Sequence, residues 1–68
     1  MSKEDLIAFL EDIITSCRKI EKYIRGKNYT DFIKEELIVD AVIRNLEIIG
    51  EAVKKLPINL RKKYSNIE

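Results

Sequence analysis

The chain has 68 residues, of which 46% are hydrophobic, and it carries 13 Lys and Arg against 12 Asp and Glu, with no His. This length allows one small domain at most, and the near-zero net charge gives no compositional support for a general polyanion-binding role. The hydrophobic fraction is too high for a disordered chain. No apolar run approaches the roughly 18 residues of a membrane span, and the N-terminus lacks a signal-peptide pattern. We therefore expect a cytoplasmic protein without a membrane partner.

Few side chains are suited to catalysis. Because His is absent, hydrolysis confined to these residues would have to use carboxylates, Lys, Arg or Tyr. Cys17 is the only cysteine, which excludes an intrachain disulfide and a cysteine metal site. Its place on an apolar helical row favours packing over a reactive thiol. These residues by themselves indicate no catalytic, cofactor-binding or metal-binding site.

The first predicted helix runs from Lys3 to Arg25. Ser2 followed by Asp5 forms an acidic variant of the capping box, and Gly26 supplies a left-handed C-terminal cap. Apolar residues recur along this helix at steps of four and three, which indicates a heptad-like seam. The seam consists of Leu6, Leu10, Ile13, Cys17, Ile20 and Ile24, flanked by Ile7, Phe9, Ile14 and Tyr23.

A short polar connection, residues 27–30, separates this helix from the next one. Asn28 and Thr30 can each cap the helix that follows, since both side chains carry an acceptor oxygen. The next helical turn either continues into the central helix or bends near Glu35 or Glu36. The sequence leaves these two arrangements open.

The central stretch, from Asp40 to Pro57, is DAVIRNLEIIGEAVKKLP. Its apolar residues follow steps of three and four, so they form one helical stripe, and a second row beside it widens the apolar face. Pro57 disfavours helical geometry in the residue before it, so the helix should end at Leu56. The stripe consists of Val39, Val42, Leu46, Ile49, Val53 and Leu56, and the second row of Ala41, Asn45, Ile48 and Ala52.

Two residues interrupt this apolar pattern. Gly50 in mid-helix costs about 1 kcal/mol relative to Ala, and close approach of another helix would explain its presence. Asn45 either hydrogen-bonds across a helix interface and sets the register, or is a partly exposed helix residue; both interpretations are open. Beyond the proline, the spacing of Leu60, Tyr64 and Ile67 allows one or two short helical turns.

These elements predict an all-α fold. It is an antiparallel hairpin of two long amphipathic helices, followed by a short C-terminal helical turn. Two helices with wide apolar faces cannot cover each other completely, because each leaves its flanking row in water. Either more helices follow, or two copies pair. With only this chain available, a homodimer that completes a four-helix bundle is the natural solution.

The segment AVIRNLEIIGEAVKKLP resembles the HEPN family of small helical proteins, specifically the HepT-like branch encoded beside minimal nucleotidyltransferases. The pattern is A-x-x-R-N-L-E-x-x-G-E-A followed by L-P. The connection NYTDF and the tail LRKKYSNI are also similar to the family, so the resemblance covers the whole chain. The matching residues are Ala41, Arg44, Asn45, Leu46, Glu47, Gly50, Glu51, Ala52, Leu56 and Pro57.

The resemblance implies a dimerising helical bundle with RNase activity, the toxin of a type VII toxin–antitoxin system. The family's antitoxin is a nucleotidyltransferase that modifies a toxin tyrosine with adenylate. Its catalytic signature is an Arg followed a few residues later by a His, with a Tyr shortly after. No His follows Arg44, and Tyr23, Tyr29 and Tyr64 are not in the modified context.

Residues 1–68 therefore correspond to a partial HEPN domain that lacks the C-terminal helices with the catalytic signature. We expect a truncated and inactive chain, with RNA as a partner only if the missing part is supplied. An alternative is a non-enzymatic dimerising module that binds a nucleotidyltransferase antitoxin or a sibling toxin. RNA binding without cleavage would use a basic cluster, although such a cluster is more often a solvated helix end. The cluster consists of Lys54, Lys55, Arg61, Lys62 and Lys63.

Overall fold

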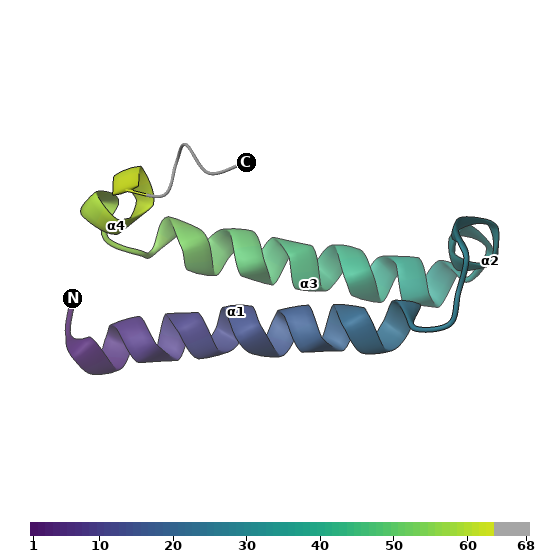
Figure 1. Cartoon of the computed structure of the whole chain (residues 1–68), viewed down its shortest axis with the longest axis horizontal. Helices are drawn as coiled ribbons and strands as arrows, with labels where there is room; N and C mark the ends of the chain where they lie inside the picture. Colours follow the sequence, from purple (N-terminus) through teal and green to yellow (C-terminus); the bar gives the residue numbers. More distant parts are fainter. Residues whose placement is uncertain (64–68) are drawn as a thin grey trace.

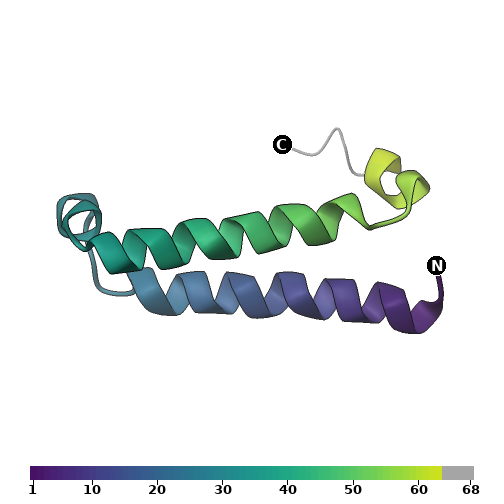
Figure 2. The ribbon, with the colours of Figure 1, turned by 180° about the vertical axis from the view of Figure 1, so that it is seen from behind.

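The computed structural model describes residues 1–63, which form four helices and no strand. They are α1 (Lys3–Ile24), α2 (Tyr29–Lys34), α3 (Glu36–Lys54) and α4 (Ile58–Lys63). The two long helices, α1 and α3, lie antiparallel and side by side, with α2 at the turn and α4 at the far end of α3 (Figure 1). The view from behind shows the same arrangement (Figure 2). The predicted all-α hairpin is confirmed, whereas its closure into a four-helix bundle stays a prediction.

Both ends of α1 form as the sequence predicts. The Asp5 backbone N–H donates to Ser2 Oγ at 3.0 Å, and the Ser2 backbone N–H donates to Asp5 Oδ2 at 3.4 Å, which completes a reciprocal capping box. Gly26 follows the helix with a φ of 74°, a left-handed conformation that glycine adopts without a steric cost. The helix ends at Ile24, one residue before the predicted Arg25.

The backbone at Glu35 separates α2 from the central helix. Asn28 caps α2, because its Oδ1 accepts a hydrogen bond from the Asp31 backbone N–H at 2.8 Å. Glu35 has φ −94° and ψ 84°, outside the helical region, so α3 starts as a separate helix. The Glu35 N–H donates to the Phe32 carbonyl, and its own carbonyl accepts from the Val39 N–H. Both backbone groups at the break are therefore satisfied.

The central helix ends at Lys54, two residues before the predicted end at Leu56. The Leu56 N–H donates to the Val53 carbonyl at 3.1 Å, a three-residue spacing that is typical of a tightened final turn. Pro57 follows directly, and its missing N–H and fixed ring disfavour a further helical turn.

The short helix α4 follows the proline and carries Leu60, which is half-buried. This agrees with the predicted short helical turn. Tyr64 and Ile67, which share the predicted spacing with Leu60, lie outside the described residues.

The hairpin is a single layer of helices, with principal extents of 41 × 26 × 16 Å. Its most buried residues are Val42 and Ala52, with 9% and 5% of their surface exposed, and the polar Ser16 and Asn45, with 3% and 6%. Among the described residues no large side chain is fully enclosed. A two-helix layer leaves both of its broad faces open, so what covers those faces becomes the main question about this chain.

Candidate interaction surface

The contact between α1 and α3 follows one row of residues on each helix, which we call the packed seam. Its members recur at steps of three and four, and each is buried or half-buried. The small residues Ser16 and Ala52 are among the most buried, which lets the two helices approach closely. The packed seam consists of Leu6, Phe9, Ile13, Ser16, Ile20 and Tyr23 on α1, and Ile38, Val42, Asn45, Ile49, Ala52 and Leu56 on α3.

A second row lies beside the packed seam on each helix, and we call these two rows the open flank. Each member follows a seam residue by one or four positions, so all members lie on the same side of their helix. Because α1 and α3 are antiparallel, the two rows adjoin on one face of the hairpin. The open flank consists of Ile7, Leu10, Ile14, Cys17 and Ile24 on α1, and Val39, Ile43, Leu46, Gly50 and Val53 on α3.

Most of the open flank is accessible to solvent in the single chain. Seven large apolar side chains in it are 39–54% exposed, from Leu10 and Val53 at the low end to Leu46 at the high end. Val39 is half-buried, and Cys17 is exposed. Isolated exposed apolar residues are ordinary, but a contiguous apolar face on a small protein marks an interaction surface.

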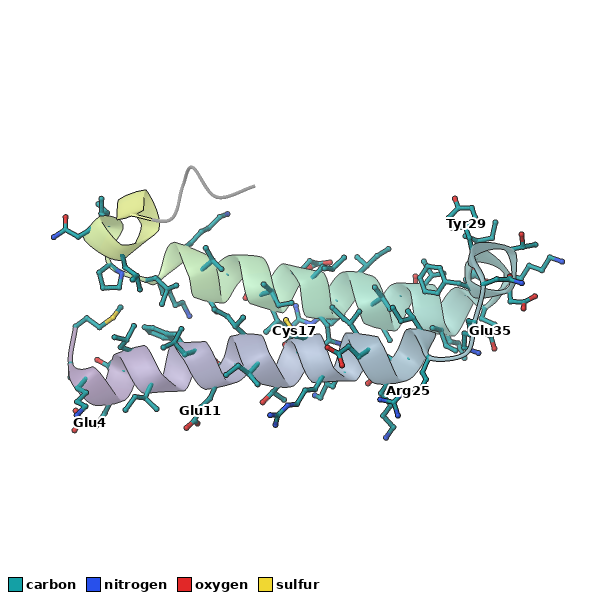
Figure 3. The ribbon with its side chains drawn as sticks, viewed as in Figure 1. Glu4, Glu11, Cys17, Arg25, Tyr29 and Glu35 are labelled. Carbon is teal, nitrogen blue, oxygen red and sulfur yellow. The ribbon has the colours of Figure 1, made fainter. Side chains whose placement is uncertain are left out.

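The opposite flank of α1 is polar. Asp12, Thr15 and Lys19 lie along it, and all three are exposed. The residues on the outer edge of α1 are charged, and Figure 3 shows Glu4, Glu11 and Arg25 pointing away from α3. On α1 the large exposed apolar side chains are therefore confined to the open flank, whereas on α3 Leu37, which is 85% exposed, lies on the opposite side.

The structure divides the predicted core and dimer face between the packed seam and the open flank. Six of its residues lie in the packed seam: Leu6, Ile13, Ile20, Val42, Ile49 and Leu56. The other six lie in the open flank: Leu10, Cys17, Ile24, Val39, Leu46 and Val53. The helix α1 is turned by about one position relative to the predicted seam, because Phe9, Ser16 and Tyr23 face α3 in place of their neighbours.

The motif residues of α3 are distributed around the helix. Asn45 and Ala52 are buried, Ala41 is half-buried, and Arg44, Glu47, Gly50 and Glu51 are exposed. Arg44 Nη1 lies 3.9 Å from Glu47 Oε2, and both side chains are more than half exposed, at 65% and 57%. An exposed pair of this kind contributes little to stability. The described residues of the motif thus form no converging catalytic group.

Asn45 is buried between the two long helices, so the interpretation as a partly exposed residue is wrong. Its Nδ2 donates to the Ala41 carbonyl at 2.8 Å within its own helix, and its Oδ1 has no hydrogen-bond partner. Within residues 1–63, the Asn45 side chain makes no hydrogen bond to another helix. A buried acceptor without a partner lowers the stability of the hairpin.

Gly50 lies on the open flank, and a Cβ placed there would meet nothing within 4 Å. No described helix of this chain approaches Gly50 closely. If another helix packs at this position, as the sequence suggests, it comes from outside the described hairpin.

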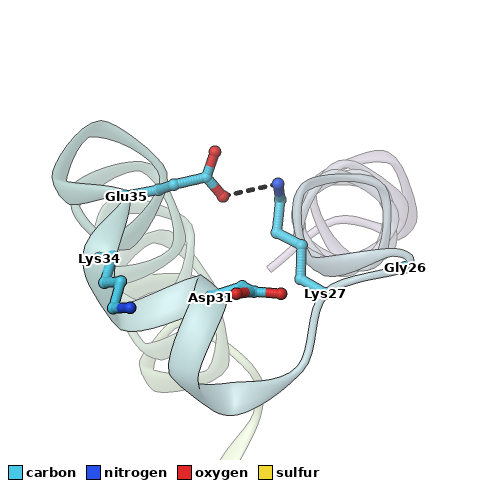
Figure 4. A pocket seen from close by; sticks show the side chains of 5 residues that line it. All are labelled: Gly26, Lys27, Asp31, Lys34 and Glu35. Carbon is cyan, nitrogen blue, oxygen red and sulfur yellow. Dashed lines mark ion pairs between the residues drawn. The ribbon is translucent and has the colours of Figure 1, made fainter.

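A shallow hollow of about 410 Å³ lies at the turn end of the hairpin, lined by Gly26, Lys27, Asp31, Lys34 and Glu35 (Figure 4). Lys27 Nζ lies 2.6 Å from Glu35 Oε2, so this ion pair joins the end of α1 to the start of α3. Glu35 makes no side-chain cap to α3, which leaves its carboxylate free for Lys27. With two cations and two anions around it, the hollow favours neither charge in a ligand.

Residues 1–63 contain no group of three or more His, Cys, Asp or Glu side chains that could hold a metal ion. None of the described helices has both the length and the apolar character needed to cross a membrane. Cys17 lies on the open flank rather than between α1 and α3, so its predicted packing role needs a partner from outside the hairpin.

The predicted basic cluster is only partly described. Lys54 and Lys55 lie at the end of α3, and Lys55 Nζ is 5.5 Å from the centroid of the Phe9 ring. This cation–π contact directs Lys55 towards α1. The side chains of the other three members, Arg61, Lys62 and Lys63, lie outside the described part of the chain.

Comparison with known proteins identifies the family. The family model described as Ribonuclease HepT-like matches residues 13–67. The protein named "Putative RNase MJ0125" from Methanocaldococcus jannaschii is 46% identical over 67 residues, which cover 98% of this chain and 58% of the relative. "Gamma-glutamylcyclotransferase and putative RNase MJ0434" from the same organism is 43% identical over 65 residues, covering 96% of this chain and 29% of the relative.

A third relative, "Probable ribonuclease HepT" from Thermococcus cleftensis, is 39% identical over 59 residues, covering 87% of this chain and 54% of the relative. No solved structure matches the chain at comparable significance. The chain spans about half the length of most of the curated relatives that it matches. The motif on α3 and these matches agree: the chain belongs to the ribonuclease HepT-like family.

Proposed function

We propose that the chain contributes a helical scaffold and an assembly surface to a HepT-like ribonuclease, the toxin of a toxin–antitoxin pair in the cytoplasm. The observation that carries this proposal is the family match over residues 13–67. The relatives named as RNases are longer than the region that this chain matches. The hairpin offers an unusually apolar face for assembly, whereas it offers no converging set of catalytic side chains.

RNA cleavage of the family's type needs a group that moves protons and a cation that holds the phosphate. The 68 residues contain no His, and the motif arginine, Arg44, is paired with Glu47 on the surface of α3. In this proposal the cleaving groups come from residues outside these 68. The hairpin then orients the polypeptide that carries those groups.

An RNA degradation assay tests whether the groups that cleave RNA lie outside this chain. The purified 68-residue chain should leave RNA intact, and the longer Methanocaldococcus relative under the same conditions serves as the control for family activity. Cleavage that stays with the 8.0 kDa chain through repeated purification would contradict the scaffold role. If the longer relative also leaves RNA intact, the ribonuclease part of the proposal fails.

The proposed partner is a nucleotidyltransferase antitoxin encoded beside the gene for this chain. Co-expression of the two proteins should give a stable complex that elutes as one peak in gel filtration. Separate elution of the two proteins at micromolar concentration would count against this partner.

A second candidate function is that of a non-enzymatic module that associates with a second copy of itself. The specific observation in its favour is the open flank, with seven large apolar side chains that are 39–54% exposed. A chain of this size buries too little surface alone for high stability, so a second copy would also supply the missing core. The particle mass in solution separates this candidate from a monomeric scaffold.

A further inference from the structure

The positive charge of this chain is concentrated in one short segment. Residues 54–63 contain five Lys and Arg and no Asp or Glu, whereas residues 1–53 contain eight Lys and Arg against eleven Asp and Glu. The chain as a whole is nearly neutral only because these two parts offset each other. A local run of cations of this kind is typical of a surface that binds a polyanion.

We propose that the basic cluster binds the phosphate backbone of RNA without regard to sequence, and that it does so without the residues that cleave RNA. The choice of RNA as the polyanion rests on the proposed function. The binding itself needs only residues of this chain, so it can be measured separately from cleavage.

The fold brings the two parts of the basic cluster to the same end of the hairpin. Lys54 is the last residue of α3, and Lys55 follows it as the C-cap. The short helix α4 lies beside this end of α3 (Figure 1), and its residue Leu60 is half-buried, so α4 has one side against the hairpin. The sequence places the other three cations in the second half of α4: Arg61, Lys62 and Lys63.

The two lysines at the end of α3 are not neutralised by the part of the hairpin that the structure describes. Lys54 and Lys55 are exposed, and neither makes an ion pair with a described side chain. Glu51, the acidic residue that precedes them on α3, is exposed as well and pairs with neither. Both ammonium groups therefore remain available to a phosphate.

An aromatic ring holds one of these two cations in place. Lys55 Nζ lies 5.5 Å from the centroid of the Phe9 ring. The ring attracts the ammonium group but carries no net charge, so the contact positions the cation without neutralising it. A positioned side chain loses less conformational entropy when it binds a ligand. Lys55 is thus prepared for a phosphate at the junction of α1 and α3.

The first turn of α1, at the same end of the hairpin, does not cancel this charge. Glu4 points away from α3 (Figure 3). The carboxylate of Asp5 accepts a hydrogen bond from the Ser2 backbone N–H at 3.4 Å, as part of the capping box. Lys3 is exposed and adds a further cation. The positive potential at this end therefore comes from both long helices and from α4.

The composition of the basic cluster favours contacts to phosphates over contacts to bases. Four of its five residues are Lys, which presents a flexible point charge, and only one is Arg, which is suited to bidentate recognition of a base edge. Phe9 is half-buried and faces Lys55, so it is not available to stack on a base. We expect binding that is independent of sequence and depends strongly on salt.

The salt dependence of RNA binding tests the proposal. In fluorescence anisotropy with a short labelled single-stranded RNA, the affinity of the purified chain should fall steeply as the salt concentration rises. Each phosphate contact contributes about 0.7 to the slope of log K against log salt, so Lys54→Glu/Lys55→Glu should lower the slope by about 1.4. The same variant should weaken binding at low salt by about tenfold or more.

Lys19→Glu/Lys22→Glu is the matched control. It makes the same change of charge at two exposed lysines of α1 that lie outside the basic cluster. It should leave the slope unchanged. Circular dichroism checks that both variants keep the helical content of the wild type.

A second variant separates phosphate binding from the contact between Lys55 and Phe9. Lys62→Glu/Lys63→Glu leaves that contact intact, and it should lower the slope by an amount similar to that of the first variant. An RNA affinity that does not respond to salt would overturn the proposal. Equal losses of affinity in the cluster variants and in the α1 control would overturn it as well.

Two further outcomes count against RNA as the ligand of the basic cluster. Tighter binding to polyglutamate than to RNA would assign the cluster to an acidic protein partner. Absence of RNA binding at low salt, by a chain with a normal helical spectrum, would leave the cluster as a solvated helix end. Cleavage of RNA by the longer relative would still support the proposed function in that case, so the two proposals fail separately.

Discussion

The packed seam and the open flank are both apolar rows with helical spacing, but they use different side chains. The packed seam includes Ser16, Asn45 and Ala52 among its most buried residues. The open flank has large branched residues, such as Ile14 and Leu46, which are 50% and 54% exposed. At these three positions of the seam the side chains are small or polar, whereas the large apolar residues of the open flank stay exposed. This difference indicates that the small residues let the two helices approach closely, while the open flank remains for a second interface.

The largest loss of stability should come from a charge introduced into the packed seam. Val42 is 9% exposed, so Val42→Asp would bury a carboxylate between α1 and α3. That costs several kcal/mol, comparable with the whole stability of a small domain. We expect the helical circular dichroism signal to be lost at every protein concentration. A helical spectrum like that of the wild type would show that Val42 does not lie in the seam.

A carboxylate on the open flank should weaken assembly rather than the folding of the hairpin. Leu46 is 54% exposed in the single chain, so Leu46→Asp costs the hairpin itself little. Burial of the carboxylate in a dimer should weaken dimerisation by about 100-fold, or about 2.7 kcal/mol. Light scattering measures the mass, and the thermal midpoint should lose its dependence on concentration. An unchanged dimer mass would exclude Leu46 from the interface.

Gly50→Ala should have opposite effects on the chain and on its assembly. A Cβ at this position meets nothing in the hairpin, so the helix gains about 1 kcal/mol from the better propensity of Ala. If a helix of a second copy packs at Gly50, the added methyl group would press against it. We expect a higher thermal midpoint in dilute solution and a lower one in concentrated solution. A rise at both concentrations would mean that no helix approaches Gly50.

The smallest change in the free energy of unfolding is expected for Asn45→Leu. The Oδ1 of Asn45 is buried without a partner, so an apolar side chain of similar size removes a desolvation cost. The free energy of unfolding should stay equal or rise by about 1 kcal/mol, measured by urea denaturation. A loss of stability would reveal a hydrogen bond that this oxygen makes in the assembled protein.

The two ends of α1 could be predicted to within one residue because their causes are local. Ser2 and Asp5 satisfy each other's backbone N–H groups, and Gly26 adopts the left-handed conformation, whatever the rest of the chain does. The sequence does not decide whether the chain bends at Glu35, because the bend accompanies an ion pair with Lys27, which lies on the other side of α2 in the chain. Local signals carry no information about such a contact.

The rotation of α1 could not be predicted from spacing. Phe9 and Leu10 are both apolar, and both belong to rows with helical periodicity, so spacing alone does not say which row faces α3. Ser16 is polar, so a prediction based on hydrophobicity places it outside the helix contact in which it is buried. The shape of the facing helix decides the choice. The family was predictable because its motif is contiguous on α3, but the groups for RNA cleavage could not be placed on any residue.

The mass of the wild-type chain in solution tests most directly whether the chain associates with itself through the open flank. Multi-angle light scattering over a range of micromolar concentrations should give twice the chain mass of 8.0 kDa. The Leu46→Asp variant should return to the single-chain mass under the same conditions. A wild-type mass of 8.0 kDa at every concentration, with an intact helical spectrum, would contradict self-association through the open flank.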